Sequence, residues 1–426
     1  MTAPPDAGRA AVQPPAAADF QAPMTEPAPP SPVVSERRIA VVGAALVALG
    51  PISLALYTPA MQELANAFGA SHAEVQHTLT AFFGGFAVAQ LACGPLSDAF
   101  GRRPVGFVFM AIYVAATVVA IFAPTIEVLT IARMLQGVGA AAGIALSRAM
   151  VRDLFTGQTS TRIMTTIGIM LAVGPALSPT IGGLLLEIAG WPWLFVLMLA
   201  YGVALIAVLA FAIPETLRDR DIGLIHPGRL VVSYGRLLMA RGFMRASLVI
   251  GLSIGGLYAL AIIMPFVMMG QLGLSPTRYG LVMICQTLSY VFGGLVTQRL
   301  MRRLPAPRLV APGLAIIGVS AIVFGLGLRL LEPSVLSVIL PVQFWAFGLA
   351  LVLPATQTAA LADYPHMAGA ASALMGFLQM AAGFSAGLLV ALFADPIIAL
   401  ATVMPAMGVL AVVAHIVLAP RRRAAG

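Results

Sequence analysis

Long stretches without charge recur along nearly the whole chain, and they constrain its fold more than any other feature. Twelve runs of about 20 mostly apolar residues follow one another between residues 39 and 419. A helix needs about 20 residues to cross the roughly 30 Å hydrocarbon core of a bilayer. Only 9% of the residues are charged, whereas soluble proteins carry about a quarter. The sequence therefore predicts a membrane protein.

The apolar runs are expected to form helices rather than the strands of a membrane barrel. They are continuous, whereas barrel strands alternate between apolar and polar residues. The sequence thus predicts an all-α membrane protein with twelve transmembrane helices. The expected spans are residues 39–60, 75–97, 105–124, 127–150, 162–187, 192–213, 246–270, 278–300, 308–328, 334–360, 368–393 and 396–419.

The longest connection, residues 214–245, divides the expected helices into six and six. A weak repeat supports two pseudo-symmetric bundles, because GPLSDAFGRR and GGLVTQRLMRR end corresponding helices in paired arginines. The later part of the connection suits either an amphipathic helix on the membrane surface or an ordinary linker. The expected parts are a disordered cytoplasmic tail (1–35), a six-helix bundle (36–213), a cytoplasmic loop (214–245), a second bundle (246–420) and a basic cytoplasmic end (421–426).

The basic residues indicate how the chain crosses the membrane. All 24 are arginines, and most fall before the first expected span, at every second connection or after the last span. Since positive loops stay in the cytoplasm, we expect both termini there. The net charge of +8 is then a signal of topology, and its dispersal over many connections argues against nucleic-acid binding.

One charged stretch, CGPLSDAFGRRPV at residues 93–105, interrupts the apolar pattern. It resembles the cytoplasmic loop signature of the major facilitator superfamily, whose fold is the twelve-helix arrangement expected above. Its glycines suit a tight turn, Asp98 suits a helix N-terminus, and Arg102 is expected to pair with Asp153. We interpret the set as a cytoplasmic latch that holds one state of a transporter. Its members are Gly94, Asp98, Gly101, Arg102, Arg103 and Asp153.

Two further stretches resemble signatures of the same superfamily. LTIARMLQGVGAA resembles that of proton-linked members, and it places Arg133 and Gln136 within a span, where an arginine normally faces a cavity or partner. GPALSPTIGG resembles that of antiporters, with serine where glycine is usual. Its expected positions are Gly174, Pro175, Pro179, Gly182 and Gly183. The same small residues also suit simple helix packing.

The chain is most similar to the Bcr/CflA group of bacterial multidrug efflux proteins, over roughly residues 39–420. Supporting stretches include YTPAM, PETL and DYPHMAGAAS. One departure concerns the first helix, where the group carries an acid two residues before the tyrosine and this chain has Ala55 before Tyr57. No other carboxylate is clearly placed in mid-membrane, so the carrier of a coupling proton stays open. We therefore predict a preference for neutral, zwitterionic or anionic amphiphiles.

Polar residues within the expected spans are candidates for the substrate cavity. Tyr57, Arg133 and Gln136 are predicted to lie at the central cavity and coupling site. Arg133 is the one charge expected within reach of that cavity. The wider set of polar and aromatic candidates is Gln90, Tyr258, Gln286, Tyr290, Gln343, Trp345, Gln357 and Gln379.

The resemblance implies a multi-pass transporter of the bacterial inner membrane that exports hydrophobic or amphiphilic small molecules by proton antiport and alternating access. A metabolite symporter or facilitator of the same fold is the alternative. We expect neither an enzyme, nor a cofactor, nor a metal site, because the sequence has no nucleotide loop, no metal-ligand cluster and few acids or histidines within spans. The expected partners are small molecules, protons and membrane lipid, with the protein a monomer.

Overall fold

The computed structural model describes residues 34–155, 157–217, 223, 226–364 and 367–419. Within these ranges the side chains of residues 157–158, 161, 165, 168–176, 227 and 368 are outside the description. Nearly all of the predicted N-terminal tail, all of residues 421–426 and part of the 214–245 connection lie outside the described residues.

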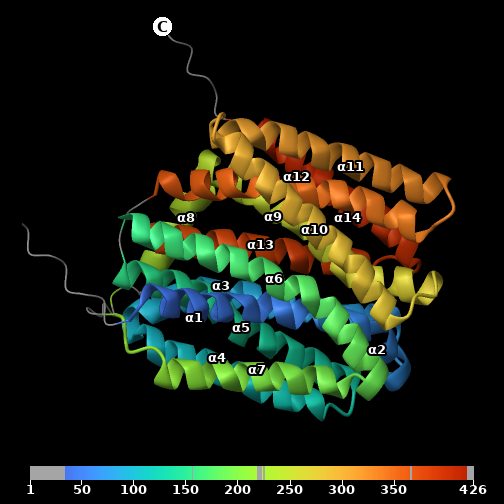
Figure 1. Ribbon diagram of the computed structural model, residues 1–426, viewed down its shortest axis with the longest axis horizontal. Helices are drawn as coiled ribbons and strands as arrows, with labels where there is room; N and C mark the ends of the chain where they lie inside the picture. The colour runs from blue at the N-terminus through green and yellow to red at the C-terminus, as the bar shows by residue number, and fades with distance from the viewer. Residues whose placement is uncertain (1–33, 156, 218–222, 224–225, 365–366, 420–426) are drawn as a thin grey trace, which may run out of the picture. The chain divides into compact units, whose positions relative to one another are not determined.

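The described residues form helices and no strands (Figure 1). The helices of the first part of the chain are α1 (Glu36–Ala55), the short η1 (Thr58–Ala60), α2 (Met61–Phe68), α3 (His72–Phe100), α4 (Arg102–Ile121), α5 (Ile126–Leu154), α6 (Gly157–Ala189) and α7 (Pro192–Phe211). Those that follow are α8 (Pro227–Met239), α9 (Arg241–Pro265), η3 (Phe266–Gln271), α10 (Pro276–Met301), η4 (Ala306–Leu309), α11 (Val310–Leu330), α12 (Val335–Ala362), α13 (Ala368–Val390) and α14 (Pro396–Val417).

The prediction of an all-α membrane protein is confirmed. Eleven helical segments in the described part of the chain are long and apolar enough to cross a bilayer, and the described apolar part of α6 is Leu177–Ala189. The first span is longer than expected, and the α-helix is interrupted near its end. There α1 ends at Ala55 and the tighter turn η1 follows, with Pro59 in it. Proline removes a helical hydrogen bond and clashes with the preceding turn, which accounts for the break.

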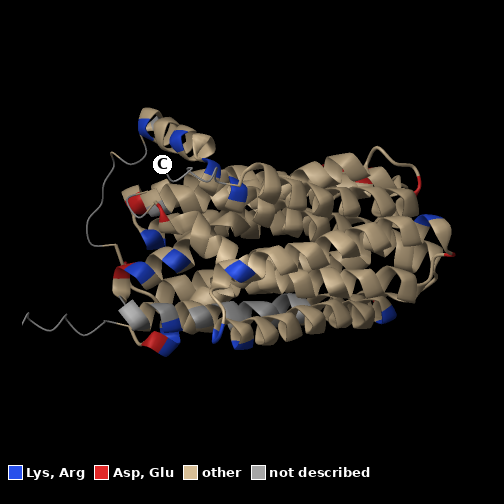
Figure 2. Ribbon diagram, turned by 90° about the horizontal axis from the view of Figure 1, so that it is seen from above, with Lys and Arg blue, Asp and Glu red and all other residues tan. Residues whose placement is uncertain are grey.

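The two ends of the bundle differ in charge. Figure 2 shows most arginines toward one end, which we call the arginine-rich end and which carries the start of α1 and the α3–α4 connection. Five helices that begin at the opposite end, α3, α5, α10, α12 and α14, have side-chain caps on their first free N–H groups, whereas α7 has none. The capping residues there are Ser71, Thr125, Ser275, Ser334 and Asp395.

The helices pack in two groups joined by two long seams. Helices α1 and α3–α7 contact one another and form the first helix group, and α9–α14 form the second. The seams between the groups are α3 against α13 and α6 against α10. Glycines permit the closest approaches within the first group: a side-chain carbon on Gly137 would lie 2.1 Å from the carbonyl oxygen of Phe82. The glycines of the LTIARMLQGVGAA stretch thus have a packing reason.

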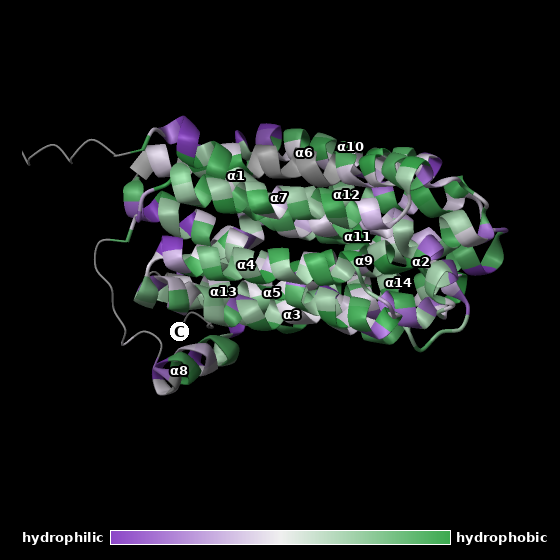
Figure 3. Ribbon diagram, turned by 90° about the horizontal axis from the view of Figure 1, so that it is seen from below, coloured by the Kyte–Doolittle hydropathy of each residue, from purple (hydrophilic) through white to green (hydrophobic). Residues whose placement is uncertain are grey.

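Helix α8 occupies the later part of the connection between the helix groups. Figure 3 shows it at the arginine-rich end, with polar and apolar segments both present. Leu237 is buried against Phe243, whereas Val231 and Met239 are exposed. The Tyr234 hydroxyl donates a hydrogen bond to the carbonyl of Leu91 at 2.8 Å. Burial raises the pKa of Tyr234 to about 12, so this donor stays protonated at physiological pH.

Candidate functional site

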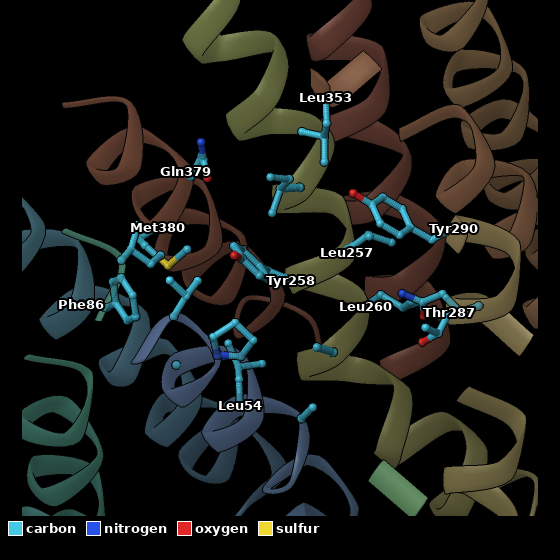
Figure 4. Close-up of a pocket in the computed structure, with 18 of the residues that line it drawn as sticks. Leu54, Phe86, Leu257, Tyr258, Leu260, Thr287, Tyr290, Leu353, Gln379 and Met380 are labelled. Carbon is cyan, nitrogen blue, oxygen red and sulfur yellow. The ribbon is translucent and has the colours of Figure 1, made fainter. Parts of the chain in front are cut away.

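A cavity of about 940 Å³ lies between the two helix groups. Residues of α1, α3, α5, α6, α9, α10, α12 and α13 line it. Most of its wall is apolar, and Figure 4 shows Phe86, Met380, Tyr258 and Tyr290 around one space. The polar residues of the wall are Thr58, Ser147, Arg148, Tyr258, Tyr279, Gln286, Thr287, Tyr290, Gln357, Thr358 and Gln379. None of the described lining residues is an aspartate or a glutamate.

Ala55 lies on this wall, together with Leu54 and Thr58. It is the last residue of α1 before the turn that carries Pro59. The position where the resembling group carries an acid is therefore a position on the cavity. In this chain it contributes a methyl group and no charge.

The wider set of polar candidates divides into two classes. Tyr258, Gln286, Tyr290, Gln357 and Gln379 line the cavity. Gln90, Gln343 and Trp345 do not. The Trp345 side chain is fully buried, and its indole N–H donates to the carbonyl of Ser253 at 3.0 Å. Its role is packing within the second helix group.

Arg133, Tyr57 and Gln136 lie together but behind the cavity wall. All three are fully buried, and none is among the lining residues. The Arg133 guanidinium lies 4.3 Å from the ring centre of Tyr57 and 4.6 Å from that of Phe82, which does line the cavity. It also donates to the Gln136 side-chain oxygen at 2.8 Å. Cation–π contacts and hydrogen bonds thus stabilise a buried charge one side chain away from the cavity.

Further hydrogen bonds fix this buried cluster in place. The Gln136 amide donates to the Thr117 hydroxyl at 2.7 Å, and the Tyr57 hydroxyl lies 2.5 Å from that of Thr78. The first of these bonds connects α5 with α4, and the second connects the start of η1 with α3. Arg133 is therefore separated from the cavity by Phe82, and its role in substrate binding or coupling stays a prediction.

Arg148 is the charged residue that the structure places on the cavity wall. In the sequence, Arg148 lies near the end of the expected span 127–150 and, with Arg152 and Arg162, flanks the joint to the next span. However, α5 continues to Leu154, so Arg148 lies more than a turn inside the helix. It donates a hydrogen bond to the Ser372 hydroxyl of α13 at 2.8 Å. Ile144, one turn earlier in α5, lines the same cavity, as residues four apart on a helix share a face.

The latch residues form a cluster at the arginine-rich end. Arg102 is 2% exposed and forms ion pairs with Asp98 and with Asp153, to the latter at 2.9 Å. It also donates to the Ser97 hydroxyl at 2.7 Å. Arg152 lies 3.8 Å from Asp98. The cluster thus joins the end of α3, the start of α4 and the end of α5.

Asp98 lies in the last turn of α3, where the helix dipole disfavours an anion. The helix N-terminus beside it is that of α13 in the second helix group, where a side-chain carbon on Gly369 would lie 3.9 Å from the Asp98 carboxylate. The same carboxylate therefore meets Arg102 of its own group and the first turn of a helix from the other group.

Glu215, in the PETL stretch, anchors the start of α4. Its carboxylate accepts hydrogen bonds from the backbone N–H groups of Arg102 and Arg103, at 2.9 and 3.2 Å. Gly101 precedes them with a φ of 105°, a conformation that favours glycine, and a side chain there would meet Glu215 at 2.6 Å. Gly94, by contrast, has open space beside it. Sequence reasoning used PETL only as a family marker and missed this role.

The GPALSPTIGG stretch lies partly at the seam between α6 and α10. Pro179 lines the cavity. A side-chain carbon on Gly183 would lie 2.3 Å from the carbonyl oxygen of Pro276, and one on Gly182 would lie 2.6 Å from that of Leu56. These glycines permit close contact between helices at the opposite end. The contacts of Gly174 and Pro175 fall outside the description.

The seam at the opposite end is also held by hydrogen bonds. Glu187 of α6 accepts bonds from the Thr277 backbone N–H at 3.1 Å and from its hydroxyl at 2.8 Å. Thr277 lies in the first turn of α10, so a carboxylate of one helix group caps a helix of the other. The cavity, for its part, extends toward the arginine-rich end as far as Arg148 and Thr358.

Comparisons with known proteins identify the group to which this arrangement belongs. The sequence profile of a family described as Major Facilitator Superfamily matches residues 43–388. The chain is 30% identical to Multidrug resistance protein D of Escherichia coli, over 88% of this chain and 94% of the relative. It is 29% identical to a Bicyclomycin resistance protein homolog of Haemophilus influenzae, over 80% and 86% of the two chains.

A solved structure supports the same fold. The crystal structure of a D-xylose-proton symporter aligns with a TM-score of 0.70 at 16% identity, over 88% of this chain and 96% of that one. At this identity the likeness shows the fold alone. The predicted twelve-helix fold is thereby confirmed, while the exact boundaries of the two bundles stay a prediction.

Proposed function

The chain belongs to the major facilitator superfamily, in its Bcr/CflA-type group of drug efflux transporters, and on this premise we propose that it exports hydrophobic and amphiphilic small molecules in exchange for protons. The cavity between the helix groups is the observation that carries the proposal. Its volume of about 940 Å³ falls in the range of small-molecule sites, which are mostly apolar with a few polar groups. Tyrosine, glutamine and methionine side chains suit varied apolar ligands.

The transport cycle that we propose alternates access by rocking the two helix groups about the cavity. Opening at the opposite end requires α6 and α10 to separate, with loss of the Glu187–Thr277 hydrogen bonds. Closing at the arginine-rich end brings the latch cluster against α13. The first group corresponds to residues 36–213 and the second to residues 246–420.

We place the protein in the bacterial inner membrane as a monomer, with the arginine-rich end and both termini in the cytoplasm. The asymmetric distribution of arginines between the two ends supports this orientation. Helix α8, with its buried Leu237 and its exposed Val231, then lies at the cytoplasmic surface of that membrane.

None of the described residues of the cavity wall is an acid that could carry the coupling proton. Arg133 keeps its proton at physiological pH, as arginines do, and does not serve as the carrier. Asp98 and Asp153 of the latch, or titration of the substrate itself, are the remaining routes for the proton.

The experiment that tests export is an accumulation assay with a panel of dyes. Cells without their own efflux pumps would produce either the wild-type chain or the Asp98→Asn variant at equal levels in the membrane. We expect lower accumulation of neutral and amphiphilic dyes with the wild-type chain, and recovery of accumulation when a protonophore is added. Export would be contradicted if cells with the wild-type chain accumulated every dye to the level of cells that lack the chain. Equal accumulation in the two strains, below that level, would count against the latch instead.

A further inference from the structure

We propose that Arg148 is the anion-binding residue of the cavity, and that the cavity takes monoanionic amphiphiles whose carboxylate, sulfonate or phosphate group meets this guanidinium. The inference rests on the proposed export function and names its substrate class. Arg148 projects from α5 on the cavity wall. Its position toward the arginine-rich end leaves the larger, apolar part of the cavity for the body of the ligand.

The partners of Arg148 set it apart from the other arginines near it. Arg102, Arg152 and Arg162 all lie within ion-pair distance of a carboxylate. No described carboxylate lies within that distance of Arg148, and no acid is among the described residues of the cavity wall. Its described hydrogen bond goes to a neutral hydroxyl, that of Ser372. A cation partly removed from water is stabilised most by an anion, and the wall supplies none.

The donors of the guanidinium match an anion that presents two oxygens side by side. Arginine presents five N–H donors in a fixed fork that binds carboxylate or phosphate through two parallel hydrogen bonds. The bond to Ser372 accounts for one of these donors. None of the other donors bonds to a described residue, so they can receive a ligand oxygen.

A second donor stands beside Arg148. Ser147 lines the same wall and is 1% exposed, and its hydroxyl makes no hydrogen bond to any described residue. It lies against Gly43 of α1, where a side-chain carbon would come within 2.7 Å of the hydroxyl oxygen. A buried hydroxyl without a partner is costly. A ligand oxygen at Arg148 gives Ser147 a partner after a change of its rotamer.

The Arg148–Ser372 hydrogen bond also joins the two helix groups, since Arg148 is in α5 and Ser372 in α13. An anion that binds Arg148 through both terminal nitrogens, Nη1 and Nη2, takes the place of the Ser372 hydroxyl as acceptor at Nη1. Ligand binding therefore competes with this link, and the removal of Ser372 is expected to favour the anion. If the arginine has only a structural role, the removal of Ser372 should weaken ligand binding as much as the removal of Arg148.

The test uses two fluorescent probes with one aromatic skeleton. 1-Anilinonaphthalene-8-sulfonate carries a sulfonate, and N-phenyl-1-naphthylamine has the same rings without charge. Saturable binding of each would be titrated with the full chain in lipid nanodiscs, after subtraction of empty nanodiscs. The variants are Arg148→Gln, Arg148→Lys and Ser372→Ala. Arg162→Gln is the matched control, because that arginine is exposed and paired with Glu36.

We expect Arg148→Gln to weaken binding of the sulfonate by about tenfold to a hundredfold, as loss of a charged hydrogen bond implies, and to leave binding of the neutral probe within about twofold. Arg148→Lys should retain part of the sulfonate affinity, and Ser372→Ala should retain or raise it. Arg162→Gln should change neither. Monodisperse elution of each variant checks the fold.

Three results would overturn the inference. If Arg148→Gln and Ser372→Ala weaken both probes alike, the arginine is a structural link. If the neutral probe binds saturably while the sulfonate does not bind the wild-type protein, the anion site at Arg148 is refuted. The proposed export function is then unaffected, because the cavity still binds an amphiphile. Absence of saturable binding for both probes would count against the proposed function as well.

Discussion

Replacing Asp98 by asparagine is expected to slow transport by about tenfold to a hundredfold, because a charged hydrogen bond contributes about 1.5–3 kcal/mol. Asp98 pairs with the buried Arg102, lies 3.8 Å from Arg152 and stands beside the first turn of α13. The amide keeps the shape and loses the charge that all three contacts use. The state with the arginine-rich end closed is therefore destabilised, and the cycle slows.

The measurement is the initial rate of substrate transport in proteoliposomes that contain equal amounts of protein. Asp363→Asn is the matched control, because that acid is exposed at the C-terminal end of α12, at the same end of the molecule. We expect the control to transport at the wild-type rate and both variants to melt near the wild-type temperature. A wild-type rate for Asp98→Asn would remove the latch from the account.

Arg102→Ala is a harsher change at the same cluster. Arg102 is 2% exposed, and its removal leaves Asp98 and Asp153 without their main partner. Breaking a buried ion pair costs about 3–5 kcal/mol, so part of any loss of transport in that variant would reflect a loss of stability. The asparagine variant separates the two effects more cleanly.

Introducing an acid at Ala55 is expected to shift selectivity toward cations by about tenfold to a hundredfold. Two opposite charges about 5 Å apart attract each other by about 3 kcal/mol at an effective dielectric constant near 20. Ala55 lies on the cavity wall, which has no acid among its described residues. Ala55→Asp would therefore supply the one negative charge on that wall.

The comparison uses a quaternary-ammonium dye and a neutral dye of similar size, with the wild type, Ala55→Asp and Ala55→Asn. The asparagine variant has nearly the same volume without the charge, so it isolates the electrostatic effect. We expect the ratio of cationic to neutral export to rise for the aspartate variant alone. Strong wild-type export of permanent cations that the acid leaves unchanged would refute this interpretation of the first helix.

Most of the fold follows from the sequence, because a bilayer permits few alternatives. Continuous apolar runs in a membrane must form helices to satisfy their backbone groups, and arginines mark the ends of these helices. The pairing of Arg102 with Asp153 also follows from spacing, since both residues were expected at the cytoplasmic ends of helices. The break in the first span was less visible, although Pro59 was a signal for it.

The placement of side chains around the cavity was harder to predict. In a soluble helix the polar face marks the side away from the core, but membrane helices are apolar on every side. The rotation of each helix about its axis is then set by packing with its neighbours. Thus Arg133 was expected at the cavity and lies behind Phe82, whereas Arg148 was expected only beside the joint between two spans and lies on the wall.

If export is exchanged for protons, protons must move in the direction opposite to the substrate during efflux. Proteoliposomes would be loaded with a substrate that has no titratable group, together with a pH-sensitive dye, and the membrane potential would be held at zero. After dilution into substrate-free buffer, outward movement of substrate through an antiporter drives protons inward. We predict acidification of the interior, slower in Asp98→Asn. Alkalinisation, as a symporter gives, or substrate efflux at constant internal pH, as a facilitator gives, would contradict the account.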